Sequence, residues 1–525
     1  MLDQSVKIRN TGGKKKRIAI LSDTHISQTG GQFNQKVFDK GISLFNKIKD
    51  VTLFLHLGDL TQWGTLMDYE FAIDQMNKFD PVSKAPLEYI IGNHDALNVG
   101  YLLFEEIIGD RHFEFETDDL YIIGIDSTKP DLPGGIIHHN IINAMRKRLE
   151  AREDKIKIVC FHNQLLPIPN TGKERSAIDD SGNMLQMLID TKADLVLNGH
   201  RHVSNLYSLS SPLKDLYIFN AGTFSCNKTR YRELFTYSVI DIINNNLTFK
   251  IFPILDADNN KKEIQRNIKT YYPRNTESNE QPKHKFIQIC NSAITKESEK
   301  KGSSIHEIVD KINQFNNIDL VVHTGNLTRN SFEEEFLIAR DLFKNLKFPF
   351  LCVPGYWDSK PPSWIYWDKY FGDLNPEFET DQIYFKGINS TTSDSKNGFI
   401  GRKRLNQFIE KVLNIGHQKF IGVCCHHSSI PTPMSVWRTE LMDAGDALSQ
   451  FARSHVNLIL NSSPSITFNV KIENSIFSNG GNIMGEHFEK NIVEIDIFER
   501  RLIHIKEHNL DTKISKIVSK YIIYP

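Results

Sequence analysis

The chain has 525 residues, of which 40% are hydrophobic and 24% are charged, and its formal net charge is −1. This length predicts two or more domains, and the near-neutral charge argues against a surface that attracts nucleic acid or anionic lipid as a whole. No apolar run of about 18 residues and no signal-peptide pattern occurs, so the sequence predicts neither a membrane span nor secretion. Most of the six cysteines lie in apolar runs without a CxxC pair, which indicates a reduced, cytoplasmic chain.

Five short apolar runs in the first half of the chain each end in polar residues. They are residues 17–21, 51–57, 87–91, 156–161 and 194–197, and amphipathic segments such as 35–48 and 183–191 lie between some of them. Apolar runs of this kind are typical of strands buried on both faces, and their alternation with helices predicts an α/β core with much parallel sheet. Because function in such sheets gathers beyond the carboxyl ends of the strands, we expect the polar clusters to meet on one rim.

The side chains expected on this rim are those of metal-binding residue types. Taken singly, an Asp after a strand reads as a turn or a helix cap, and a buried His reads as a hydrogen-bonded core residue. Five clusters in succession favour a metal site instead. The candidate ligands are Asp23, His25, Asp59, Asn93, His162, His200 and His202.

In chain order these residues resemble the calcineurin-like metallophosphoesterase family, whose stand-alone members include phosphodiesterases related to cyclic-nucleotide hydrolases. The matching motifs are Asp-x-His at 23–25, Gly-Asp at 58–59, Gly-Asn-His-Asp at 92–95, the strand-end His162, and Gly-His-x-His at 199–202. Asn163 is a departure, since relatives often carry Pro or His there.

The resemblance implies a four-layer αββα sandwich with two adjacent divalent metal ions. Asp23, His25 and His202 would bind one ion, Asn93, His162 and His200 would bind the other, and Asp59 would bridge them. We expect Mn²⁺, with Fe and Zn²⁺ as alternatives, because these ligands include no thiolate. His94 is the expected proton donor to the leaving oxygen, and Asp95 either orients His94 or caps the loop.

The second half of the chain repeats the plan of the first. "FETDDLYIIGIDST" (115–128) returns as "FETDQIYFKGINST" (378–391), "HLGDLT" (56–61) as "HTGNLT" (323–328), and "LVLNGHRH" (195–202) as "LILNSSPS" (458–465). We therefore predict a tandem duplication with an active domain at 15–255, a polar linker at 256–284 and a second domain at 285–510.

The second copy lacks most of the ligand types. The seven positions become Asn291, Ala293, Asn326, Tyr356, His426, Ser463 and Ser465, and His94 becomes Trp357. We predict a degenerate pseudoenzyme domain that packs on the first as a pseudo-subunit, because neutral replacements relieve the cost of buried carboxylates without metal. An unrelated site made from His323, His426, His427 and Asp358 is the alternative.

The predicted function is metal-dependent hydrolysis of a phosphodiester or phosphomonoester, of a small nucleotide-like substrate, by hydroxide activated at two metal ions. Lys228, Arg230 and Arg232 are candidate contacts for the substrate phosphate, or else form a solvated basic turn. One alternative is a nuclease, which the near-neutral charge disfavours. Another is a binding scaffold that uses the second domain, which the complete ligand set of the first domain disfavours.

Overall fold

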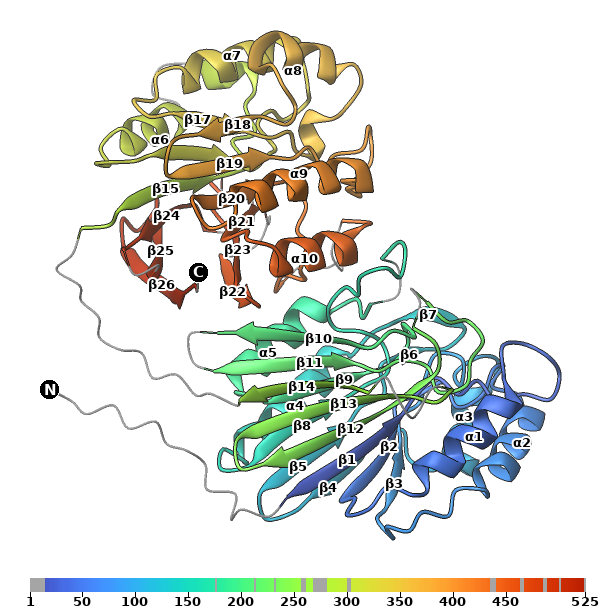
Figure 1. Ribbon diagram of the computed structural model, residues 1–525. Coiled ribbons are helices and arrows are strands. Elements are labelled where there is room, and N and C mark those ends of the chain that lie inside the picture. Colours follow the sequence, from blue (N-terminus) through green and yellow to red (C-terminus); the bar gives the residue numbers. More distant parts are fainter. Residues whose placement is uncertain are drawn as a thin grey trace, which may run out of the picture. The chain divides into compact units, whose positions relative to one another are not determined.

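The computed structural model describes residues 15–174, 177–211, 214–230, 233–255, 261–267, 281–299, 304–434, 441–462, 467–484, 489–499 and 502–523. They form two compact units (Figure 1). The first comprises the described residues of 1–171 and 175–273, and the second those of 172–174 and 274–525.

The first unit contains five helices and fourteen strands among the described residues. The helices are α1 (Gln35–Phe45), α2 (Leu66–Met76), α3 (Gly100–Ile107), α4 (His139–Glu150) and α5 (Ser181–Asp190). The strands are β1 (Lys16–Leu21), β2 (Leu53–His56), β3 (Leu87–Tyr89), β4 (Phe113–Glu116), β5 (Leu120–Gly124), β6 (Thr128–Lys129), β7 (Leu132–Gly135), β8 (Ile156–Cys160), β9 (Leu195–Asn198), β10 (Asn205–Ser210), β11 (Asp215–Asn220), β12 (Thr236–Ile243), β13 (Asn246–Pro253) and β14 (Lys262–Asn267).

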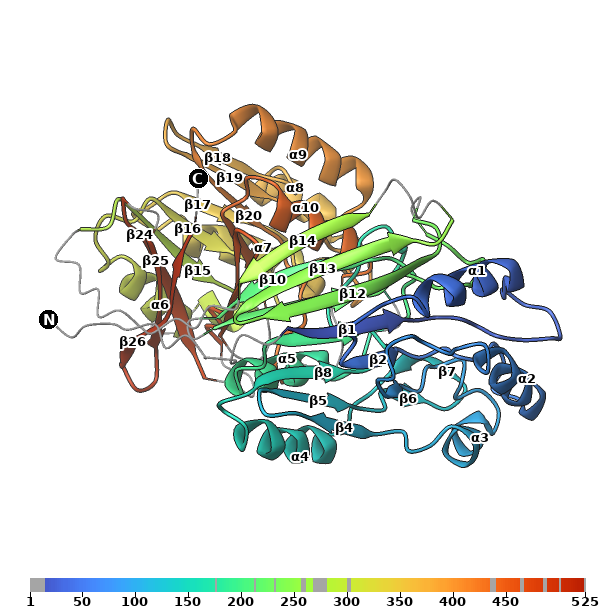
Figure 2. The same ribbon diagram turned by 60° about the horizontal axis from the view of Figure 1, so that its bottom comes forward.

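Two mixed sheets pack face to face in this unit. One has the order β14-β13-β12-β1-β2-β3, in which β1, β2 and β3 are parallel and β12 runs antiparallel to β1. In the other, β5, β8, β9 and β11 are parallel neighbours, and β4 and β10 pair with them antiparallel. Figure 2 shows α4 and α5 beside β5 and β8, away from β12 and β13.

Strand residues alternate between two cores, which explains the layers. Ile18 and Ile20 of β1 face the second sheet, where they pack in one cluster with side chains such as Ile158 of β8. Ala19 and Leu21 face the other way and pack with α1 residues such as Phe38. Because successive side chains of a strand point to opposite faces, both faces of this sheet are covered. The predicted αββα sandwich is thus confirmed in this unit.

Side chains at the helix starts explain where two of the helices begin. Asn34 Oδ1 accepts a hydrogen bond from the Val37 amide at 3.2 Å before α1, and Thr65 Oγ1 accepts one from the Asp68 amide at 3.2 Å before α2. Such caps satisfy amides that lack a partner within the helix. The predicted helices at 35–48 and 183–191 correspond to α1 and α5 and end slightly earlier than their patterns do.

The second unit repeats this order of elements. Its helices are η1 (Lys296–Glu299), α6 (Ser304–Ile312), α7 (Glu333–Phe343), η2 (Tyr356–Asp358), α8 (Ser363–Phe371), α9 (Arg402–Ile415) and α10 (Ala444–Arg453). Its strands are β15 (His284–Ile289), β16 (Leu320–His323), β17 (Phe350–Cys352), β18 (Glu377–Glu379), β19 (Ile383–Gly387), β20 (Phe420–Cys424), β21 (Leu458–Asn461), β22 (Phe468–Ile472), β23 (Ser475–Asn479), β24 (Asn491–Ile497), β25 (Leu502–Asn509) and β26 (Ser515–Ile522).

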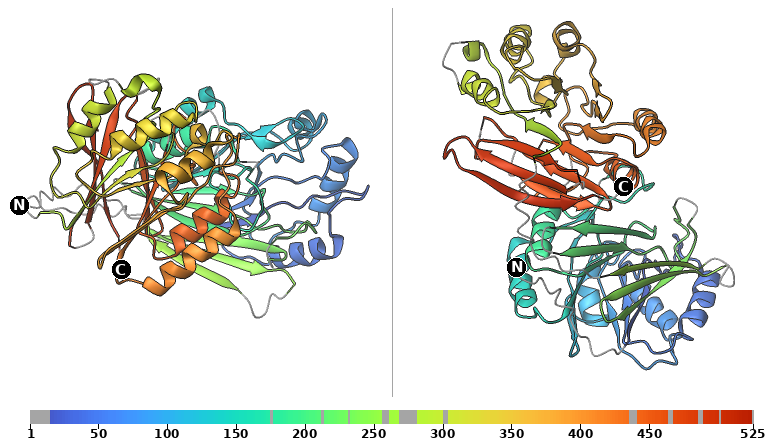
Figure 3. Two further views of the ribbon diagram at one scale, coloured as in Figure 1. Left: turned by 90° about the horizontal axis from the view of Figure 1, so that it is seen from above. Right: turned by 60° about the vertical axis from the view of Figure 1, so that its left-hand side comes forward.

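The sheets of the second unit also follow the order found in the first. One runs β17-β16-β15-β24-β25-β26, and the other pairs β18-β19-β20-β21-β23-β22. One core cluster joins Phe286 and Leu320 to strand residues of the facing sheet such as Phe385, and another joins Ile287 to α7 residues such as Phe336. Figure 3 shows the yellow and orange helices of this unit outside its strands.

Two strands fall outside the predicted domain limits of 15–255 and 285–510. β14 lies within 256–284, the segment expected to be a linker, and β26 lies wholly after residue 510. The sequence of β14, "KEIQRN", contains one apolar residue, Ile264, which packs on the inter-sheet core while its neighbours remain half-buried or exposed. A strand at the end of a sheet needs few apolar residues, so its sequence looks like a loop.

All six cysteines are buried and form no disulfide in the described structure. Among the described residues no helix has both the length and the apolar character needed to cross a bilayer.

Two positions in β12 test the inter-sheet core. Ile240 has no exposed surface, whereas Ile243 at the end of the same strand is 41% exposed. We expect Ile240→Ala to lower the free energy of unfolding by about 2–5 kcal/mol, since it removes buried methyl groups and leaves a cavity. Ile243→Ala is the matched control and should stay within about 0.5 kcal/mol of the parent protein. Equal midpoints of thermal unfolding for the two variants would contradict this core assignment.

Candidate metal centre

The first unit gathers the predicted ligands at the carboxyl ends of strands from both of its sheets. β1, β2 and β3 of one sheet and β8 and β9 of the other each lead directly into a loop that carries one or more of them. All seven side chains are buried or half-buried there: Asp23, His25, Asp59, Asn93, His162, His200 and His202.

Ligand atoms from these residues lie close enough to surround two ions. In each of two groups, one nitrogen or carboxylate oxygen per residue lies within 4.8 Å of the others. Because Asp59 belongs to both groups, its carboxylate has the place expected of a bridging ligand. The groups are Asp23, His25, Asp59 and His202, and then Asp59, His162 and His200.

The loops that carry the ligands are fastened to one another by their backbones. The Asp23 amide donates to Gly58 O at 3.0 Å, and the His25 amide donates to Asp59 O at 2.9 Å. Positive φ angles occur at Asp23 (54°), His25 (52°), Asp59 (55°), His200 (72°) and His202 (56°). Left-handed backbone is uncommon outside glycine and clusters at functional sites. The strand-end loops therefore bend sharply in order to aim these side chains.

Backbone carbonyls fix the orientation of two histidine ligands. His162 Nδ1 donates to Leu57 O at 2.7 Å, and His202 Nδ1 donates to Lys228 O at 2.7 Å. In each ring Nε2 is therefore the nitrogen that remains for a metal ion. His162 Nε2 lies 3.1 Å from Asp59 Oδ2, and His202 Nε2 lies 3.2 Å from Asp23 Oδ1.

The donor set fits divalent cations. Asp23 and Asp59 are at most 1% exposed, and among the described residues their ion-pair partners are histidines. His162 Nε2 faces the Asp59 carboxylate, and both side chains are buried. Buried carboxylates that lie this close together are costly alone, and a bound cation would compensate them.

The carboxylates and imidazoles shift one another's pKa values. Burial alone would raise the pKa of Asp59, but His162 and His94 hold it well below its usual value, and His202 lowers the pKa of Asp23 against the same effect of burial. Although burial opposes it, Asp59 raises the pKa of His162 to about 9, and Asp23 raises that of His202 to about 10.

His94 and Asp95 are neighbours in the loop after β3, and their side chains make different contacts. The His94 ring lies 4.5 Å from the His25 ring, and its Nδ1 donates to Gln62 O at 2.8 Å. The Asp95 carboxylate accepts hydrogen bonds from the amides of Leu60, Thr61 and Gly92 and from Thr61 Oγ1. Of the two roles expected for Asp95, these contacts match the loop cap, whereas Gln62 orients His94.

The structure describes two of the three predicted substrate contacts, Lys228 and Arg230. Lys228 is exposed, and its carbonyl orients His202. Arg230 is half-buried, its Nη1 donates to Thr171 O at 3.1 Å, and its buried Nε has no hydrogen-bond partner among the described residues. Arg232 lies outside the described residues.

Sequence reasoning missed two residues at this rim, Gln62 and Cys226. One ligand atom each from His25, His202 and Cys226 lies within 4.8 Å of the other two, and all three side chains are buried. A buried cysteine thus lies beside two of the predicted ligands. "FSCNK" (224–228) matches no metal motif, and only the fold brings this loop to the end of β1. The sequence signal that could have pointed to Cys226 is its position shortly after a strand.

The equivalent rim of the second unit keeps the loop geometry with other side chains. Asn291 (φ 55°), Ala293 (φ 45°) and Asn326 (φ 57°) have the same left-handed backbone. Asn326 Nδ2 donates to Asn291 Oδ1 at 2.9 Å, and His426 Nδ1 donates to Thr324 O at 3.0 Å. Ser463 and Ser465 lie outside the described residues.

The alternative site in the second unit has its side chains in structural contacts. His323 Nε2 contacts Ser292 Oγ at 2.9 Å, and His427 Nδ1 contacts Ser390 Oγ at 2.9 Å. Asp358 accepts the amides of Leu327, Thr328 and Gly355. Within the described residues these side chains belong to no group that could hold a metal ion.

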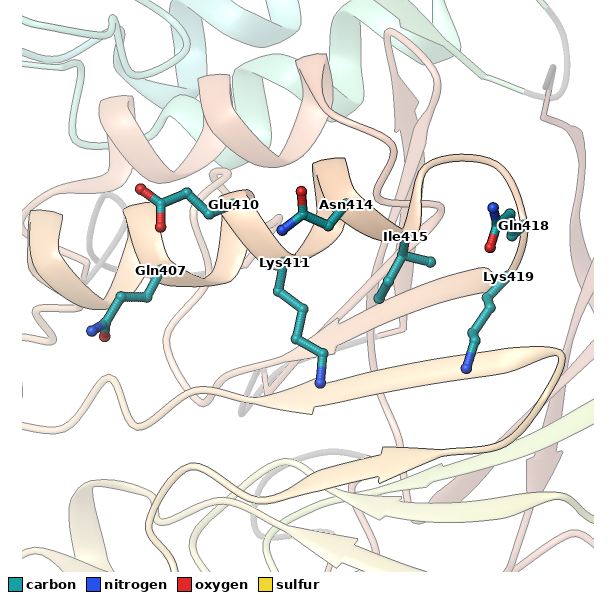
Figure 4. Close-up of a pocket in the computed structure, with 7 residues that line it drawn as sticks. All are labelled: Gln407, Glu410, Lys411, Asn414, Ile415, Gln418 and Lys419. Carbon is teal, nitrogen blue, oxygen red and sulfur yellow. The ribbon is translucent and has the colours of Figure 1, made fainter.

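A hollow of about 630 Å³ lies elsewhere on the second unit, around the end of α9 (Figure 4). Its lining contains one carboxylate and two lysines: Gln407, Glu410, Lys411, Asn414, Ile415, Gln418 and Lys419. Lys411 and Lys419 are paired with Glu379. The hollow is open and has no donor set for a metal ion, so it is not a candidate for phosphoester chemistry.

Residues 16–204 match the family model described as calcineurin-like phosphoesterase. No curated protein matches the chain. Among solved structures, a purple acid phosphatase from yellow lupin (Lupinus luteus) aligns at 12% identity over 49% of this chain and 54% of its own, with a TM-score of 0.37. The chain thus spans about half of that enzyme's length.

Two further solved structures align with about half of the chain. GAP50, "the anchor in the inner membrane complex of Plasmodium", aligns at 18% identity over 50% of this chain and 90% of its own, with a TM-score of 0.36. A dimetal phosphatase from Danio rerio aligns at 10% identity over 49% and 99%, with a TM-score of 0.35.

Metal content tests the ligand assignment with a matched pair of histidines. His162 and His426 are both buried, and each donates Nδ1 to a backbone carbonyl. We expect His162→Asn to lose at least half of the bound metal by elemental analysis, whereas His426→Asn keeps all of it. Loss of metal from the His426 variant, or none from the His162 variant, would place the centre elsewhere.

Metal binding should release protons at neutral pH. In the metal-free protein His162 and His202 carry a proton at pH 7, because their pKa values of about 9 and 10 lie above it, yet both must be neutral to bind a metal ion. We therefore expect release of about two protons at pH 7 and tighter metal binding as the pH rises toward 9. Calorimetric titration in buffers of different ionisation heat measures this, and heats that do not depend on the buffer would refute it.

Proposed function

We propose, from the match of residues 16–204 to the calcineurin-like phosphoesterase model, that the first unit hydrolyses a small, nucleotide-like phosphodiester or phosphomonoester with the help of two divalent cations. One observation carries the proposal: two buried carboxylates, Asp23 and Asp59, lie among histidines at the carboxyl ends of strands from both sheets. Mn²⁺ is the expected ion, with Fe and Zn²⁺ as alternatives.

The ions, when bound, supply an activated water and neutralise charge on the phosphoryl group. The residues of the chain position the substrate and the proton donor. Asp59 holds the two ligand groups together, and its Oδ1 accepts the His94 amide at 2.7 Å. This contact fixes His94 next to the reacting phosphorus, because phosphoryl transfer depends chiefly on positioning and on charge compensation.

His94 is proposed to protonate the leaving oxygen. A carbonyl only accepts, so the contact with Gln62 O requires a proton on His94 Nδ1. Nε2 is then the nitrogen that exchanges a proton with substrate. Asp95 keeps the loop in place from the other side and does not need to touch the substrate.

Arg230 is the proposed phosphate contact. Its unpaired Nε and its proximity to Asp23 and Cys226 support a guanidinium that faces the same rim. A guanidinium matches phosphate oxygens well and would favour a compact phosphoester. A role for Lys228 and Arg232 remains part of the proposal, and a nuclease is the alternative that the substrate panel below distinguishes.

We further propose that the second unit arose by duplication and no longer binds metal, and that it serves as a pseudo-subunit of the first. The hydrogen bond between Asn326 and Asn291 supports this, since two amides pair directly where the first unit carries two carboxylates. The positive φ of Ala293 supports the duplication as well. Left-handed backbone is unfavourable for alanine, and no side-chain contact of Ala293 within the described residues explains it, whereas the equivalent His25 has the same conformation.

A substrate panel tests the proposal. Purified protein with Mn²⁺ should turn over an aryl phosphodiester or monoester and should not cleave single-stranded DNA. Cyclic nucleotides are included in the panel as substrates of the expected nucleotide-like kind. Asp59→Asn should abolish turnover, and the fold tolerates this change since Asn326 occupies the corresponding loop. His94→Gln should lower kcat about 10²–10⁴-fold while metal content stays constant. Full turnover by Asp59→Asn would contradict the site, and preferred cleavage of DNA would favour the nuclease.

A further inference from the structure

Large apolar side chains are exposed on the segments that follow β2, β3 and β5 in the first unit. Each keeps between 42% and 56% of its surface exposed: Trp63, Leu66, Met67, Val99, Leu102 and Leu132. A single exposed apolar side chain needs no explanation, whereas a group of them that lies together forms a surface suited to binding. The position of this group relative to the metal centre therefore matters.

Hydrogen bonds at Asn98 join the three segments. Asn98 Nδ2 donates to Trp63 O at 3.0 Å, and the Asn98 amide donates to Asp131 Oδ1 at 2.7 Å. Val99 directly follows Asn98, and Leu132 directly follows Asp131. The other three side chains lie in the first turns of α2 and α3, which begin at this place. We call the six side chains together the apolar edge.

The apolar edge adjoins His94. Gln62 O, which accepts a hydrogen bond from His94 Nδ1 at 2.8 Å, belongs to the peptide group that links Gln62 to Trp63. The next residue, Gly64, packs on the loop of His94, since a Cβ atom there would lie 2.8 Å from Asp95 O and 3.1 Å from His94 O. Because an imidazole ring is small, a group attached to an oxygen at His94 Nε2 lies within reach of the Trp63 indole.

The two helices that begin at the apolar edge carry acidic side chains and no basic ones. α2 contains Asp68, Glu70 and Asp74, and α3 contains Glu105 and Glu106. Negative charge of this density repels polyanions. Nucleic acid and anionic lipid are therefore poor occupants of the edge, whereas an uncharged group of a small substrate meets no such repulsion.

The second unit has no such apolar loop where its metal ligands are lost. The Asn330 amide donates to a carboxylate of α7 at 2.8 Å, as the Trp63 amide donates to one of α2 at 2.9 Å, so Asn330 stands in the place of Trp63. The first turn of α7 is acidic, whereas α2 begins with Leu66 and Met67. Ile365 of α8 is exposed as well, so the difference lies in the loop that orients His94 in the first unit.

We propose that the apolar edge binds the leaving group of the substrate, so that the first unit prefers phosphoesters whose leaving alcohol carries an uncharged, apolar group. Trp63 is the specificity-determining residue, because an indole offers a large, rigid apolar surface beside the proton donor. The inference rests on the proposed function, in which His94 protonates the leaving oxygen. A planar base and an aliphatic chain share the required chemistry, since both remove apolar surface from water when they bind.

A series of n-alkyl phosphoesters from methyl to hexyl tests this, in the monoester or diester class that the substrate panel identifies. These leaving alcohols differ in apolar surface much more than in acidity, so their reactivity without enzyme is similar. We expect kcat/KM of the parent protein to rise at least about tenfold from methyl to hexyl, because each buried methylene adds binding energy. In Trp63→Asn the hexyl-to-methyl ratio should fall below about threefold, and Trp63→Phe should keep most of it.

Ile365→Ser is the matched control, because Ile365 is an exposed apolar residue of the second unit. It should leave the hexyl-to-methyl ratio unchanged, and every variant should bind as much metal as the parent protein. Benzyl and cyclohexylmethyl esters then distinguish the two kinds of leaving group: a higher kcat/KM for benzyl indicates a planar group, and the reverse indicates an aliphatic one.

The outcomes separate the two proposals. If the parent protein turns over the methyl ester and the hexyl ester equally well, the role of the apolar edge is overturned and the proposed function stands. Flotation of the protein with neutral phosphatidylcholine vesicles, lost in Trp63→Asn, would in that case assign the edge to a lipid surface instead. If the parent protein turns over no ester in the presence of Mn²⁺, the proposed function itself is overturned.

Discussion

The close approach of the loops after β2 and β3 is the constraint on which the rest of the centre depends. A Cβ atom at Gly92 would lie 2.1 Å from the Asp59 amide nitrogen, so only glycine fits there. The buried Asp95 carboxylate ties the two loops together through the amides of Leu60, Thr61 and Gly92. Because the loops cannot separate, Asp59 is held between the ligand groups and presents Oδ1 to the His94 amide. The surrounding scaffold has little freedom to relax, and it therefore holds these residues in their strained positive-φ conformations.

The second unit contains the same constraint without the charges. A Cβ at Gly355 would lie 2.1 Å from the Asn326 amide nitrogen, and Asp358 accepts the amides of Leu327, Thr328 and Gly355. The Trp357 amide donates to Asn326 Oδ1 at 3.0 Å, as the His94 amide does to Asp59. The two units therefore share this backbone arrangement and differ in the side chains that it carries.

The sequence predicted those parts of the site that short-range patterns encode. Apolar runs that end in Asp, Asn or His located the strand ends, and the seven residues predicted as ligands lie at one rim. It could not predict the partners that the fold brings from elsewhere in the chain. Gln62 reaches His94 and Cys226 reaches His25 through loops whose sequences carry no motif. β14 was read as linker for a similar reason, since a strand at the end of a sheet needs only Ile264 to be apolar.

His162 and His426 show why charge, and not shape, decides what each rim does. Both are buried and both donate Nδ1 to a backbone carbonyl. Asp59 nonetheless raises the pKa of His162 to about 9 against the effect of burial, whereas burial lowers that of His426 to about 4 against the hydrogen bond with Thr324 O. The first rim therefore holds protons that a cation would displace, and the second holds a neutral ring with no carboxylate beside it among the described residues. Where amides stand in place of the two carboxylates, both the attraction for cations and the cost of burying charge are absent, so the loops of the second unit need no cation to offset buried charge.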